Sequence, residues 1–367
     1  MSKSYYSLGL MSGTSMDGVD ASIIQSDGEN KYKVIIDKYF EYPLGIYKDL
    51  TELRDKIKSS KDLINFSREI KSVEKKITLF HANVVKNILK KTKKNIDFVG
   101  FHGQTIFHNA EEKISKQLGD GKLLSKITKK TVVYDFRKND LKNGGEGAPL
   151  APVFHKMLEK KFNIKPVSFF NIGGILNKTT IWNDGSLSAK DEGPGMCLID
   201  KWIRTNSKKK YDLNGDIARS GKINKIILDQ YSNTLRDSNL GKKSYDISDF
   251  DMLLTKNLSL EDGAATLTFH TANIFITNFK SNKTYKDLSK EKTILCGGGR
   301  KNKFLVNIIK TYNKDVKLID DYGIDGDFVE SQAFAYLAIR SYLKLPISFP
   351  NTTGVKKPCT GGIIIKN

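Results

Sequence analysis

The sequence has few cysteines and lacks the long hydrophobic segments of membrane proteins. Its 367 residues include three cysteines, Cys197, Cys296 and Cys359, which are far apart and odd in number. They form neither a metal-binding spacing nor a disulfide framework, which indicates a reducing compartment. No apolar run approaches the roughly 20 residues needed to span a bilayer, and the first residues lack a signal-peptide core. We therefore expect a cytoplasmic protein with no membrane partner.

The common nucleotide-binding fingerprints are also missing. No Gly-x-x-x-x-Gly-Lys-Ser/Thr occurs, no Gly-x-Gly-x-x-Gly precedes a helix, and the protein-kinase signatures are absent. His102, His108 and His155 lack metal-ligand spacing, which argues against zinc. Any nucleotide site must therefore be built in another way.

The formal charge of +20, from 61 basic and 41 acidic residues, permits an anionic partner. However, the lysines are spread along the chain, as in Lys75-Lys76 and Lys208-Lys209-Lys210, and no tract interleaves them with stacking aromatics. We expect solvated lysine-rich faces and no nucleic acid partner. A basic field would also help to gather small anionic substrates.

The length exceeds what one compact core usually holds, so two domains are expected. Three adjacent strands at about 5–11, 19–24 and 33–42 predict a meander, followed by a helical region over 47–94. Strands at 96–101 and 131–134 flank a helix near 118–128. In the middle, a strand at 166–172, a Gly-Gly turn and a strand at 175–182 echo the first hairpin, which suggests a duplicated α/β domain. Later helices are predicted at 198–205, 224–235, 263–279, 302–312 and 327–343, with a strand at 293–296.

The turn between the first two strands is made almost wholly of glycine, hydroxyl and carboxylate residues, Ser12-Gly13-Thr14-Ser15-Met16-Asp17-Gly18-Val19-Asp20. Glycines permit unusual backbone angles and close approaches, and the hydroxyls and amides can cradle a phosphate. Asp17 and Asp20 would repel that phosphate unless Mg²⁺ stood between. A polar hairpin turn without any ligand is the alternative.

Three further glycine turns follow predicted strands, around Gly103, Gly173-Gly174 and Gly297-Gly298-Gly299. A single turn of this kind is more often structural than phosphate-binding. Four of them in one chain fit a nucleotide that is gripped from both sides of a cleft.

Several polar residues next to these turns could carry chemistry. Asp191, on a loop that Gly193-Pro194-Gly195 should make tight, suits a general base, but a turn aspartate also bonds its own backbone. Glu330 begins the last long helix, where a carboxylate is favoured for purely electrostatic reasons as well. Arg137 suits bidentate binding of a carboxylate or phosphate. His102 and Gln104, at a strand end, suit sugar hydroxyls or an anion, although a lone histidine is usually structural.

Together these residues resemble the signature of the anhydro-N-acetylmuramic acid kinase family. The matching segments run in order from the first strand to the last helix and cover nearly the whole chain. They are Gly9–Asp20, Gly100–His108, Asp135-Phe136-Arg137, Gly144–Leu150, Asn171–Gly174, Asp191 with Gly193-Pro194-Gly195, Cys296–Gly299, and Glu330 within an Ala-Phe-Ala helix.

The resemblance implies an α/β fold of two actin-like (ribonuclease H-like) domains, with mixed sheets covered by helices and ATP in an interdomain cleft. We expect residues 1–134 plus about 345–367 to form the N-terminal domain and 135–344 the C-terminal one. The family uses water to open the anhydro bridge of 1,6-anhydro-N-acetylmuramic acid and phosphorylates the freed hydroxyl, giving N-acetylmuramic acid 6-phosphate during cell-wall sugar recycling. A homodimer is also implied.

The resemblance assigns roles by position. Asp191 would be the base that activates water, and Glu330 would assist at the sugar. His102, Gln104 and Arg137 would bind the substrate, and Asp17 would hold Mg²⁺ through ATP. The remaining matches would bind ATP, namely Gly13, Thr14, Ser15, Met16, Asp17, Gly18, Val19, Asp20, Asn171, Gly173, Gly174, Gly297, Gly298 and Gly299.

Two departures from the family pattern concern substrate fine-specificity. Met196 stands where the pattern has asparagine, and Lys242-Lys243-Ser244-Tyr245-Asp246 replaces a stretch like Pro-Lys-Ser-Thr-Gly. The alternatives that remain are a kinase for a free hexosamine or another anhydro sugar, a non-catalytic ATP-dependent binding or regulatory protein on the same scaffold, and a basic nucleic-acid binder.

Overall fold

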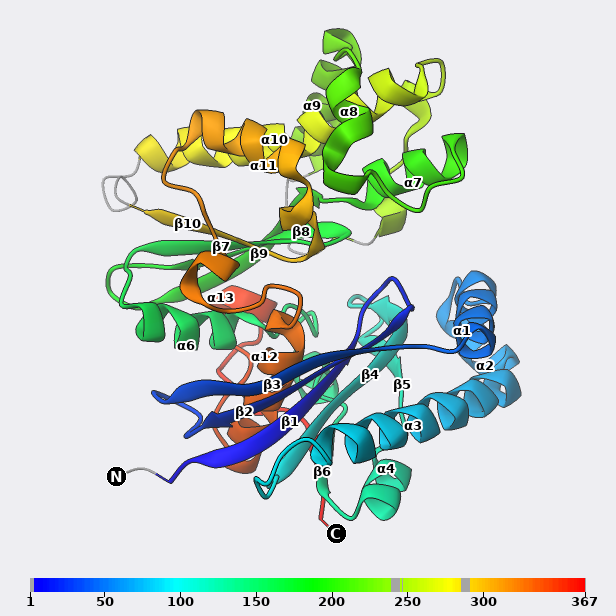
Figure 1. Ribbon diagram of the computed structural model, residues 1–367, viewed down its shortest axis with the longest axis vertical. Helices are drawn as coiled ribbons and strands as arrows, with labels where there is room; N and C mark the ends of the chain where they lie inside the picture. Colours follow the sequence, from blue (N-terminus) through cyan, green and yellow to red (C-terminus); the bar gives the residue numbers. More distant parts are fainter. Residues whose placement is uncertain (1–2, 239–244, 246, 285–290, 367) are drawn as a thin grey trace. The chain divides into compact units, whose positions relative to one another are not determined.

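The computed structural model describes residues 3–238, 245, 247–284 and 291–366. The chain divides into two compact units (Figure 1). Unit 1 comprises Met1–Phe162 and Phe328–Asn367, and unit 2 comprises Asn163–Asp327.

Unit 1 is built on a seven-stranded mixed sheet in the order β12-β6-β4-β1-β2-β3, with β5 paired to β4. β1 pairs antiparallel with β2 and parallel with β4, while β6 continues parallel to β4. The strands are β1 (Tyr5–Ser12), β2 (Gly18–Ser26), β3 (Tyr32–Glu41), β4 (Phe98–Asn109), β5 (Ile114–Leu118), β6 (Thr131–Tyr134) and β12 (Ile363–Ile365).

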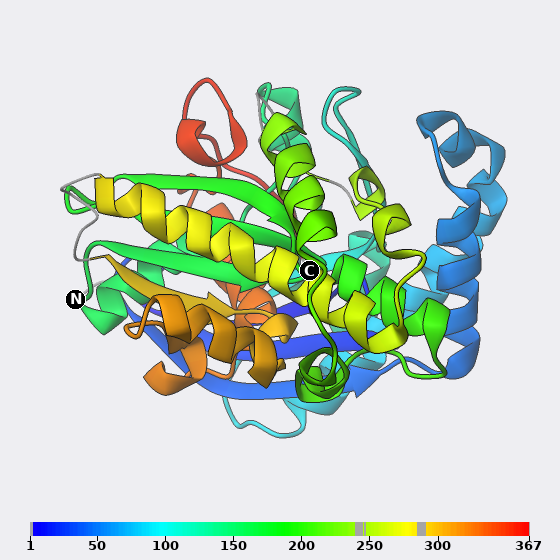
Figure 2. The same ribbon diagram turned by 90° about the horizontal axis from the view of Figure 1, so that it is seen from above.

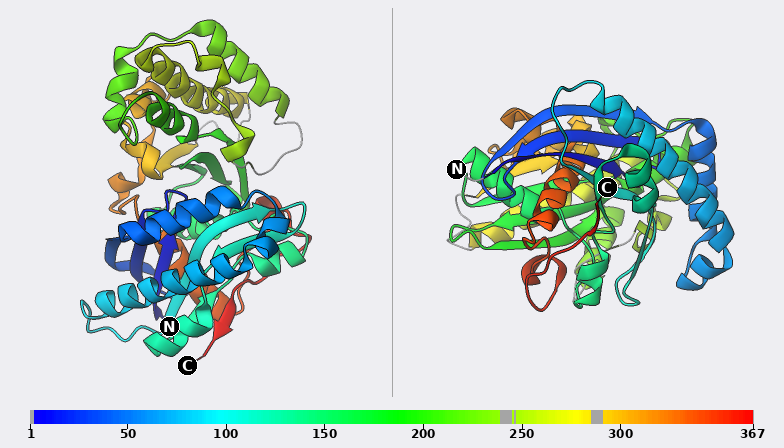
Figure 3. Two further views of the ribbon diagram at one scale, coloured as in Figure 1. Left: turned by 90° about the vertical axis from the view of Figure 1, so that its right-hand side faces the viewer. Right: turned by 90° about the horizontal axis from the view of Figure 1, so that it is seen from below.

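Helices cover both faces of this sheet (Figure 3). Leu8, Leu10, Val99 and Phe101 join a core cluster with α1 and α3, and α12 packs on the opposite face of β1 and β4. The helices of unit 1 are α1 (Leu44–Lys56), α2 (Ser60–Asn65), α3 (Ser67–Leu89), α4 (Gly121–Thr128), α5 (Lys138–Lys142), α6 (Pro152–Phe162), α12 (Val329–Tyr342) and α13 (Pro350–Thr353).

The backbone of α12 rests directly on two glycines of the central strands. Gly9 of β1 and Gly100 of β4 are partners in the parallel register. A Cβ atom at Gly9 would lie 1.9 Å from the carbonyl oxygen of Ser331, and one at Gly100 would lie 2.2 Å from that of Phe334. Since real Cβ contacts are never so short, only glycine permits this approach of helix to sheet.

A buried polar network ties the first turns of α12 to β2 and β3. The Ser22 hydroxyl donates to Asp37 Oδ1 at 2.6 Å and lies 2.6 Å from the Ser331 hydroxyl. The Gln332 side chain donates to Asp37 Oδ2 at 2.9 Å and accepts from the Tyr32 hydroxyl at 2.5 Å. Because these buried groups satisfy one another, the network fixes the position of the helix as well as its approach distance.

Unit 2 contains a five-stranded mixed sheet in the order β11-β10-β7-β8-β9. Its strands are β7 (Val167–Ile172), β8 (Ile175–Ile181), β9 (Leu187–Pro194), β10 (Lys292–Cys296) and β11 (Lys317–Leu318). β7 pairs antiparallel with β8 and parallel with β10, as β1 does with β2 and β4 in unit 1. Apart from β5 and β12, which pair antiparallel with β4 and β6 of unit 1, the two sheets repeat one topology. The first strand lies in the centre, two antiparallel strands lie on one side, and two parallel strands lie on the other.

Helices α10 and α11 pack on the sheet of unit 2, and a second group of helices joins α10 (Figure 2). Phe170 and Leu176 from the sheet meet Phe275 of α10 and Leu305 of α11 in one cluster. No helix among the described residues is both long and apolar enough to cross a membrane. The helices of unit 2 are α7 (Cys197–Asn206), α8 (Asp216–Ser220), α9 (Lys225–Ser238), α10 (Leu260–Thr284) and α11 (Lys303–Tyr312), with short 3₁₀ turns at Leu213–Gly215, Ile247–Asp249, Leu253–Thr255, Gly298–Lys301 and Ile319–Tyr322.

The repeated strand order confirms the predicted fold class of two actin-like α/β domains with mixed sheets covered by helices. The compact units differ from the predicted domains, 1–134 plus about 345–367 and 135–344, in where they begin and end. Residues 135–162 and 328–344 group with unit 1, because α12 packs on the first sheet and α6 packs on α12.

Two segments differ from the predicted elements for local reasons. His102 and Gln104 lie inside β4 and not at a strand end, because the strand kinks at Gly103, where φ is +74°, and then continues in a hairpin with β5. Asp191 lies on a strand, β9, and not on a tight loop. Gly193 adopts φ +142°, an angle that favours glycine, and its Cβ position faces the side-chain ends of Leu235 and Ile274 at about 3 Å.

We predict that Gly100→Ala destabilises the protein by about 3 kcal/mol or prevents folding, because the added methyl group would overlap the α12 backbone. Urea unfolding measures the change. Gly45→Ala in α1 is the matched control, since nothing lies within 4 Å of its Cβ position, and its stability should be unchanged or slightly raised. Equal midpoints for wild type and Gly100→Ala would contradict the close packing of α12.

Candidate functional site

The β1–β2 hairpin of unit 1 presents an exposed tip. Thr14, Ser15 and Asp17 are exposed, whereas Val19 is buried and Asp20 is partly buried. The left-handed residue of the turn is Met16, at φ +58°, and not one of the glycines. Gly18 is instead required by close approach, since a Cβ atom would lie 2.5 Å from the Phe40 carbonyl oxygen.

The tip has the chemistry of an anion site. The backbone amides of Thr14, Ser15 and Asp17 donate to no other residue that the structure describes, so they are available to a ligand. A left-handed residue in such a turn produces the concave set of amides that binds phosphates. Gly13 is half-buried, and a Cβ atom there would meet only Ser15 Oγ, at 3.8 Å.

Asp17 is the carboxylate of this tip that suits a cation. Ser15 Oγ donates to Asp17 Oδ1 at 2.7 Å. Burial and the neighbouring carboxylate of Asp17 raise the pKa of the Tyr39 hydroxyl, which therefore stays protonated beside it. Because Mg²⁺ in nucleotide sites takes one or two carboxylates plus phosphate oxygens, one exposed carboxylate beside free amides fits such an ion.

His102, which lies inside β4, and Arg137, just beyond the carboxyl end of β6, form a bonded pair. Arg137 Nη2 lies 3.0 Å from His102 Nε2, and Arg137 Nη1 donates to the Gly147 carbonyl at 2.8 Å. His102 Nδ1 lies 2.9 Å from the Gly103 carbonyl oxygen. The carbonyl oxygen can only accept a hydrogen bond, and the guanidinium can only donate one. The ring is therefore neutral, with Nδ1 as donor and Nε2 as acceptor.

The environment keeps the His102 ring neutral. Burial lowers the pKa of His102 to about 3, and the charge of Arg137 adds to the shift. The ring also packs on Phe334 of α12, with the two ring centroids 4.4 Å apart and the planes tilted by 41°. The histidine thus serves as a fixed acceptor for Arg137, which agrees with the structural alternative considered for it and leaves the predicted sugar contact to be tested.

Glu330 of α12 belongs to the same part of unit 1. It is half-buried in the first turn of the helix, as the sequence predicted. Burial lowers the pKa of Arg137, while the carboxylates of Glu330 and Asp140 oppose that shift. Arg137 Nε has no hydrogen-bond partner among the described residues although it is shielded from solvent. The structure therefore brings His102, Arg137 and Glu330 together as a charged group with an unused donor.

Gln104 contacts the hairpin. Its Nε2 donates to the Gly13 carbonyl at 3.0 Å, while its buried Oε1 accepts from no described residue. This side chain connects the predicted sugar-binding strand to the predicted ATP hairpin, a link that no sequence spacing indicated.

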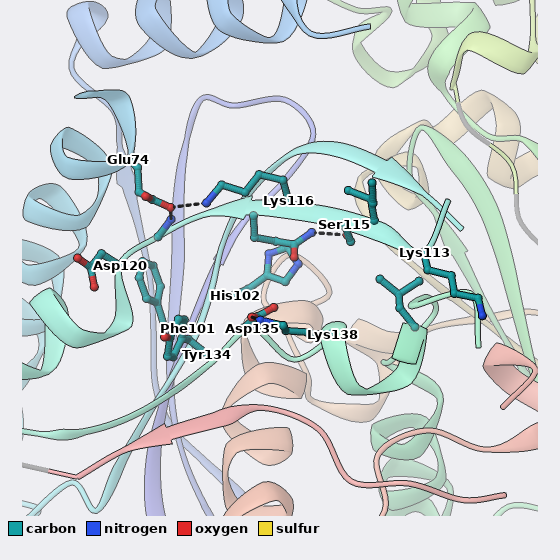
Figure 4. Close-up of a pocket in the computed structure, with 14 residues that line it drawn as sticks. Glu74, Phe101, His102, Lys113, Ser115, Lys116, Asp120, Tyr134, Asp135 and Lys138 are labelled. Atoms are coloured by element: carbon teal, nitrogen blue, oxygen red, sulfur yellow. Dashed lines mark hydrogen bonds and ion pairs between the residues drawn. The ribbon is translucent and has the colours of Figure 1, made fainter. Parts of the chain in front are cut away.

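A cavity of about 500 Å³ opens beside His102 in unit 1 (Figure 4). Lysines and carboxylates alternate around it, with Lys116 paired to Glu74 at 2.7 Å and Lys138 lying 3.9 Å from Asp135. Burial raises the pKa of Asp135. The mixed lining of the cavity suits a polar molecule of low net charge.

In unit 2 the glycine turns gather at the carboxyl ends of the parallel strands β7 and β10. A Cβ atom at Gly297 would lie 2.4 Å from Asn171 Oδ1, and one at Gly299 would lie 2.3 Å from the Ile172 side chain. Gly298 has nothing within 4 Å of its Cβ position, so its Cα faces open space. The carboxyl ends of parallel strands are where α/β folds bind ligands.

The Gly173-Gly174 turn supports the segment that follows Asp191. The amides of Gly195 and Met196 donate to the carbonyls of Gly174 and Gly173 at 2.9 and 2.8 Å. Met196, where the family pattern has asparagine, packs against the apolar clusters of this unit. The substitution thus exchanges a polar side chain for core packing.

Among the described residues of unit 2, Asn177 and Tyr245 donate to Asp191. Asn177 Nδ2 donates to its Oδ1, and the Tyr245 backbone amide donates to its Oδ2 at 2.8 Å. The side chain is buried, with about 7% exposed. Of the altered segment 242–246, Tyr245 is described and the other four residues lie outside the described part. The one described residue is therefore a direct partner of the predicted base.

Sequence reasoning missed Arg300, which anchors the Gly297–Gly299 turn. Its guanidinium donates to the Gly297 carbonyl at 3.1 Å and forms ion pairs with Asp320 and Asp327, each at 2.7 Å. These contacts lower the pKa of Asp320. An arginine directly after three glycines, with aspartates recurring at 320, 325 and 327, was the available signal.

Comparison with known proteins gives a consistent result. The family model described as anhydro-N-acetylmuramic acid kinase matches residues 5–367. The chain is 54% identical over 374 aligned positions to the anhydro-N-acetylmuramic acid kinase of Pelagibacter ubique, covering 100% of both chains. It is 37% identical to that of Agrobacterium fabrum, covering 98% of both. Among solved structures, an activator of 2-hydroxyisocaproyl-CoA dehydratase from Clostridium difficile matches with a TM-score of 0.42 and 14% identity, over 91% of this chain and 94% of the other.

We predict that His102 remains a neutral ring with the proton on Nδ1 down to pH 5. A histidine whose folded pKa is depressed binds a proton more readily when unfolded, so its contribution to stability falls as pH drops below about 6.5. Nitrogen NMR of histidine-labelled protein reports the tautomer, and His102→Asn assigns the signal. A His102 ring that titrates near pH 6.5 would contradict the assignment.

Proposed function

The chain belongs to the anhydro-N-acetylmuramic acid kinase family, and from this premise we propose how its residues carry out the reaction. The enzyme is a phosphotransferase that phosphorylates 1,6-anhydro-N-acetylmuramic acid in cell-wall sugar recycling. The family match over residues 5–367 is the observation that carries this function. We propose that water opens the anhydro bridge and that ATP supplies the phosphoryl group to the freed six-position hydroxyl.

Asp191 is the general base that removes a proton from the attacking water. The two N–H groups on its oxygens stabilise a carboxylate and fix its direction. Opening of the strained acetal passes through an oxocarbenium-like state, which a water activated by a carboxylate can intercept. The departing oxygen then becomes the nucleophile toward the γ-phosphoryl group, and this transfer depends mainly on positioning and charge neutralisation.

Arg137, Glu330 and Gln104 bind the sugar, and His102 contributes to this substrate site through Arg137. The substrate carries a lactyl carboxylate, which the guanidinium of Arg137 is suited to bind in a bidentate manner. His102 orients that guanidinium through the 3.0 Å contact. Glu330 assists by accepting hydrogen bonds from the sugar.

The hairpin holds the phosphates of ATP through the free amides of its tip, with residues Gly13 to Asp20 forming the cradle. Asn171, Gly173-Gly174 and Gly297–Gly299 contribute to nucleotide binding, with Gly298 presenting backbone whose Cβ position is open. Asp17 would hold Mg²⁺ bound to ATP, and the charge of such an ion would favour phosphoryl transfer.

We further propose a homodimer that works in the cytoplasm. All three cysteines are free thiols, which suits a reducing compartment. Light scattering of the purified protein tests the dimer.

The direct test is incubation with ATP, Mg²⁺ and 1,6-anhydro-N-acetylmuramic acid, followed by mass spectrometry. We expect N-acetylmuramic acid 6-phosphate and ADP in equal amounts. A phosphorylated sugar that retains the anhydro bridge, or no product from folded protein, would contradict the proposal.

We predict that Asp191→Asn lowers turnover at least a thousandfold and changes sugar binding less than threefold, because it removes the base and keeps the shape. Quench-flow measures turnover and calorimetry measures binding. Glu192→Gln is the matched control, since Glu192 is the adjacent buried carboxylate and binds Asn278 and Lys190. Near-normal turnover in Asp191→Asn, or an equal loss in Glu192→Gln, would exclude the assignment.

A further inference from the structure

The tip of the β1–β2 hairpin is held from inside unit 1 by its carbonyl groups. The Gly13 carbonyl accepts from Gln104 Nε2 at 3.0 Å, that of Asp17 from the Tyr42 amide at 2.8 Å, and that of Gly18 from Ser12 Oγ at 2.7 Å. With these carbonyls turned inward, the amides of the tip are left for a ligand.

Ser12 and Tyr42 form a chain of two buried hydroxyls behind the tip. Ser12 Oγ lies 2.7 Å from the Gly18 carbonyl oxygen and 2.6 Å from Tyr42 Oη. A carbonyl only accepts, so the single hydroxyl proton of Ser12 is used on Gly18. Tyr42 must therefore donate to Ser12, and the order is Tyr42 to Ser12 to the Gly18 carbonyl.

Tyr42 connects this chain to the rigid part of unit 1. Its ring packs on Phe80 at 4.9 Å and on His81 at 6.2 Å, both in α3. Burial raises the pKa of the Tyr42 hydroxyl, so this group remains a donor at neutral pH. The same residue also holds Asp17 through its backbone amide. One residue thus sets the position of both Asp17 and Gly18 relative to α3.

We propose that Ser12 and Tyr42 are positioning residues for the phosphates of ATP, acting through the hairpin and without touching the nucleotide. This inference rests on the proposed role of the hairpin. Removing the Tyr42 hydroxyl leaves the ring packing intact but frees Ser12 Oγ to reorient, so the amides of the tip lose their fixed direction. When the ligand itself must order the donors, part of its binding free energy is used for that ordering, and the affinity falls.

The experiment compares Tyr42→Phe, Ser12→Ala and the double variant with wild type. We expect the KM for ATP and the calorimetric Kd for ADP to rise about fivefold to tenfold in each variant. A change of this size corresponds to the loss of one buried hydrogen bond. The KM for the sugar should change less than twofold. The double variant should equal Ser12→Ala, because both changes break one chain.

Tyr336→Phe is the matched control. It removes a buried tyrosine hydroxyl that donates to the Gly28 carbonyl at 2.8 Å, in the turn at the opposite end of β2 from the hairpin. Tyr336→Phe should lower the melting temperature about as much as Tyr42→Phe does, and it should leave the KM for ATP unchanged.

Three results would overturn the inference. The first is an unchanged KM for ATP in Tyr42→Phe. If the wild type makes the phosphorylated sugar, this result contradicts the positioning role and leaves the proposed function intact. The second is a parallel rise in both KM values, which indicates a merely structural role. The third is wild-type protein that neither binds ADP nor uses ATP, in which case the proposed function fails as well. If Ser12→Ala does not fold, Tyr42→Phe alone decides the matter.

Discussion

Contact between the α12 backbone and the paired glycines Gly9 and Gly100 is the constraint on which unit 1 depends. It sets how far the helix lies from the central strands, and the Ser22–Ser331 and Asp37–Gln332 bonds set its position along them. Glu330 in the first turn of the helix and Phe334, which packs on His102, are thereby placed together. A larger residue at either glycine would disturb the candidate site as well as the core.

Backbone groups and buried hydrogen bonds supply much of the candidate site. The hairpin offers amides while its carbonyls are occupied, and the turns at Gly173-Gly174 and Gly297–Gly299 bring main chain close to main chain. Such amides need no reorganisation when charge arrives, which is what phosphoryl transfer requires of its surroundings. The charged side chains are fixed by partners of their own, as Asp191 is by Asn177 and Tyr245. Rigid support behind each group is common to both units.

Local patterns in the sequence predicted much of the fold, and their limits are physical. Short strand-like segments located β1, β2 and β7, alternation located β3, and the repeated strand-turn-strand indicated the duplicated domain. Glycines were harder to interpret, because a sequence does not show whether a glycine makes a turn or admits a neighbour. Gly193 has φ +142° in a strand that was predicted as a loop, and Met16 adopts the angle expected of a glycine.

The candidate residues were singled out by their chemistry and received their roles through a family resemblance, but their partners were not predicted. The bond from Gln104 to Gly13 spans 91 residues, and that from Tyr245 to Asp191 spans 54, so no local motif encodes either.

The reaction in ¹⁸O-labelled water tests the central claim most directly. The account predicts one labelled oxygen on the anomeric carbon of the 6-phosphate product, at a rate equal to ADP formation. A phosphorylated product without label would contradict it.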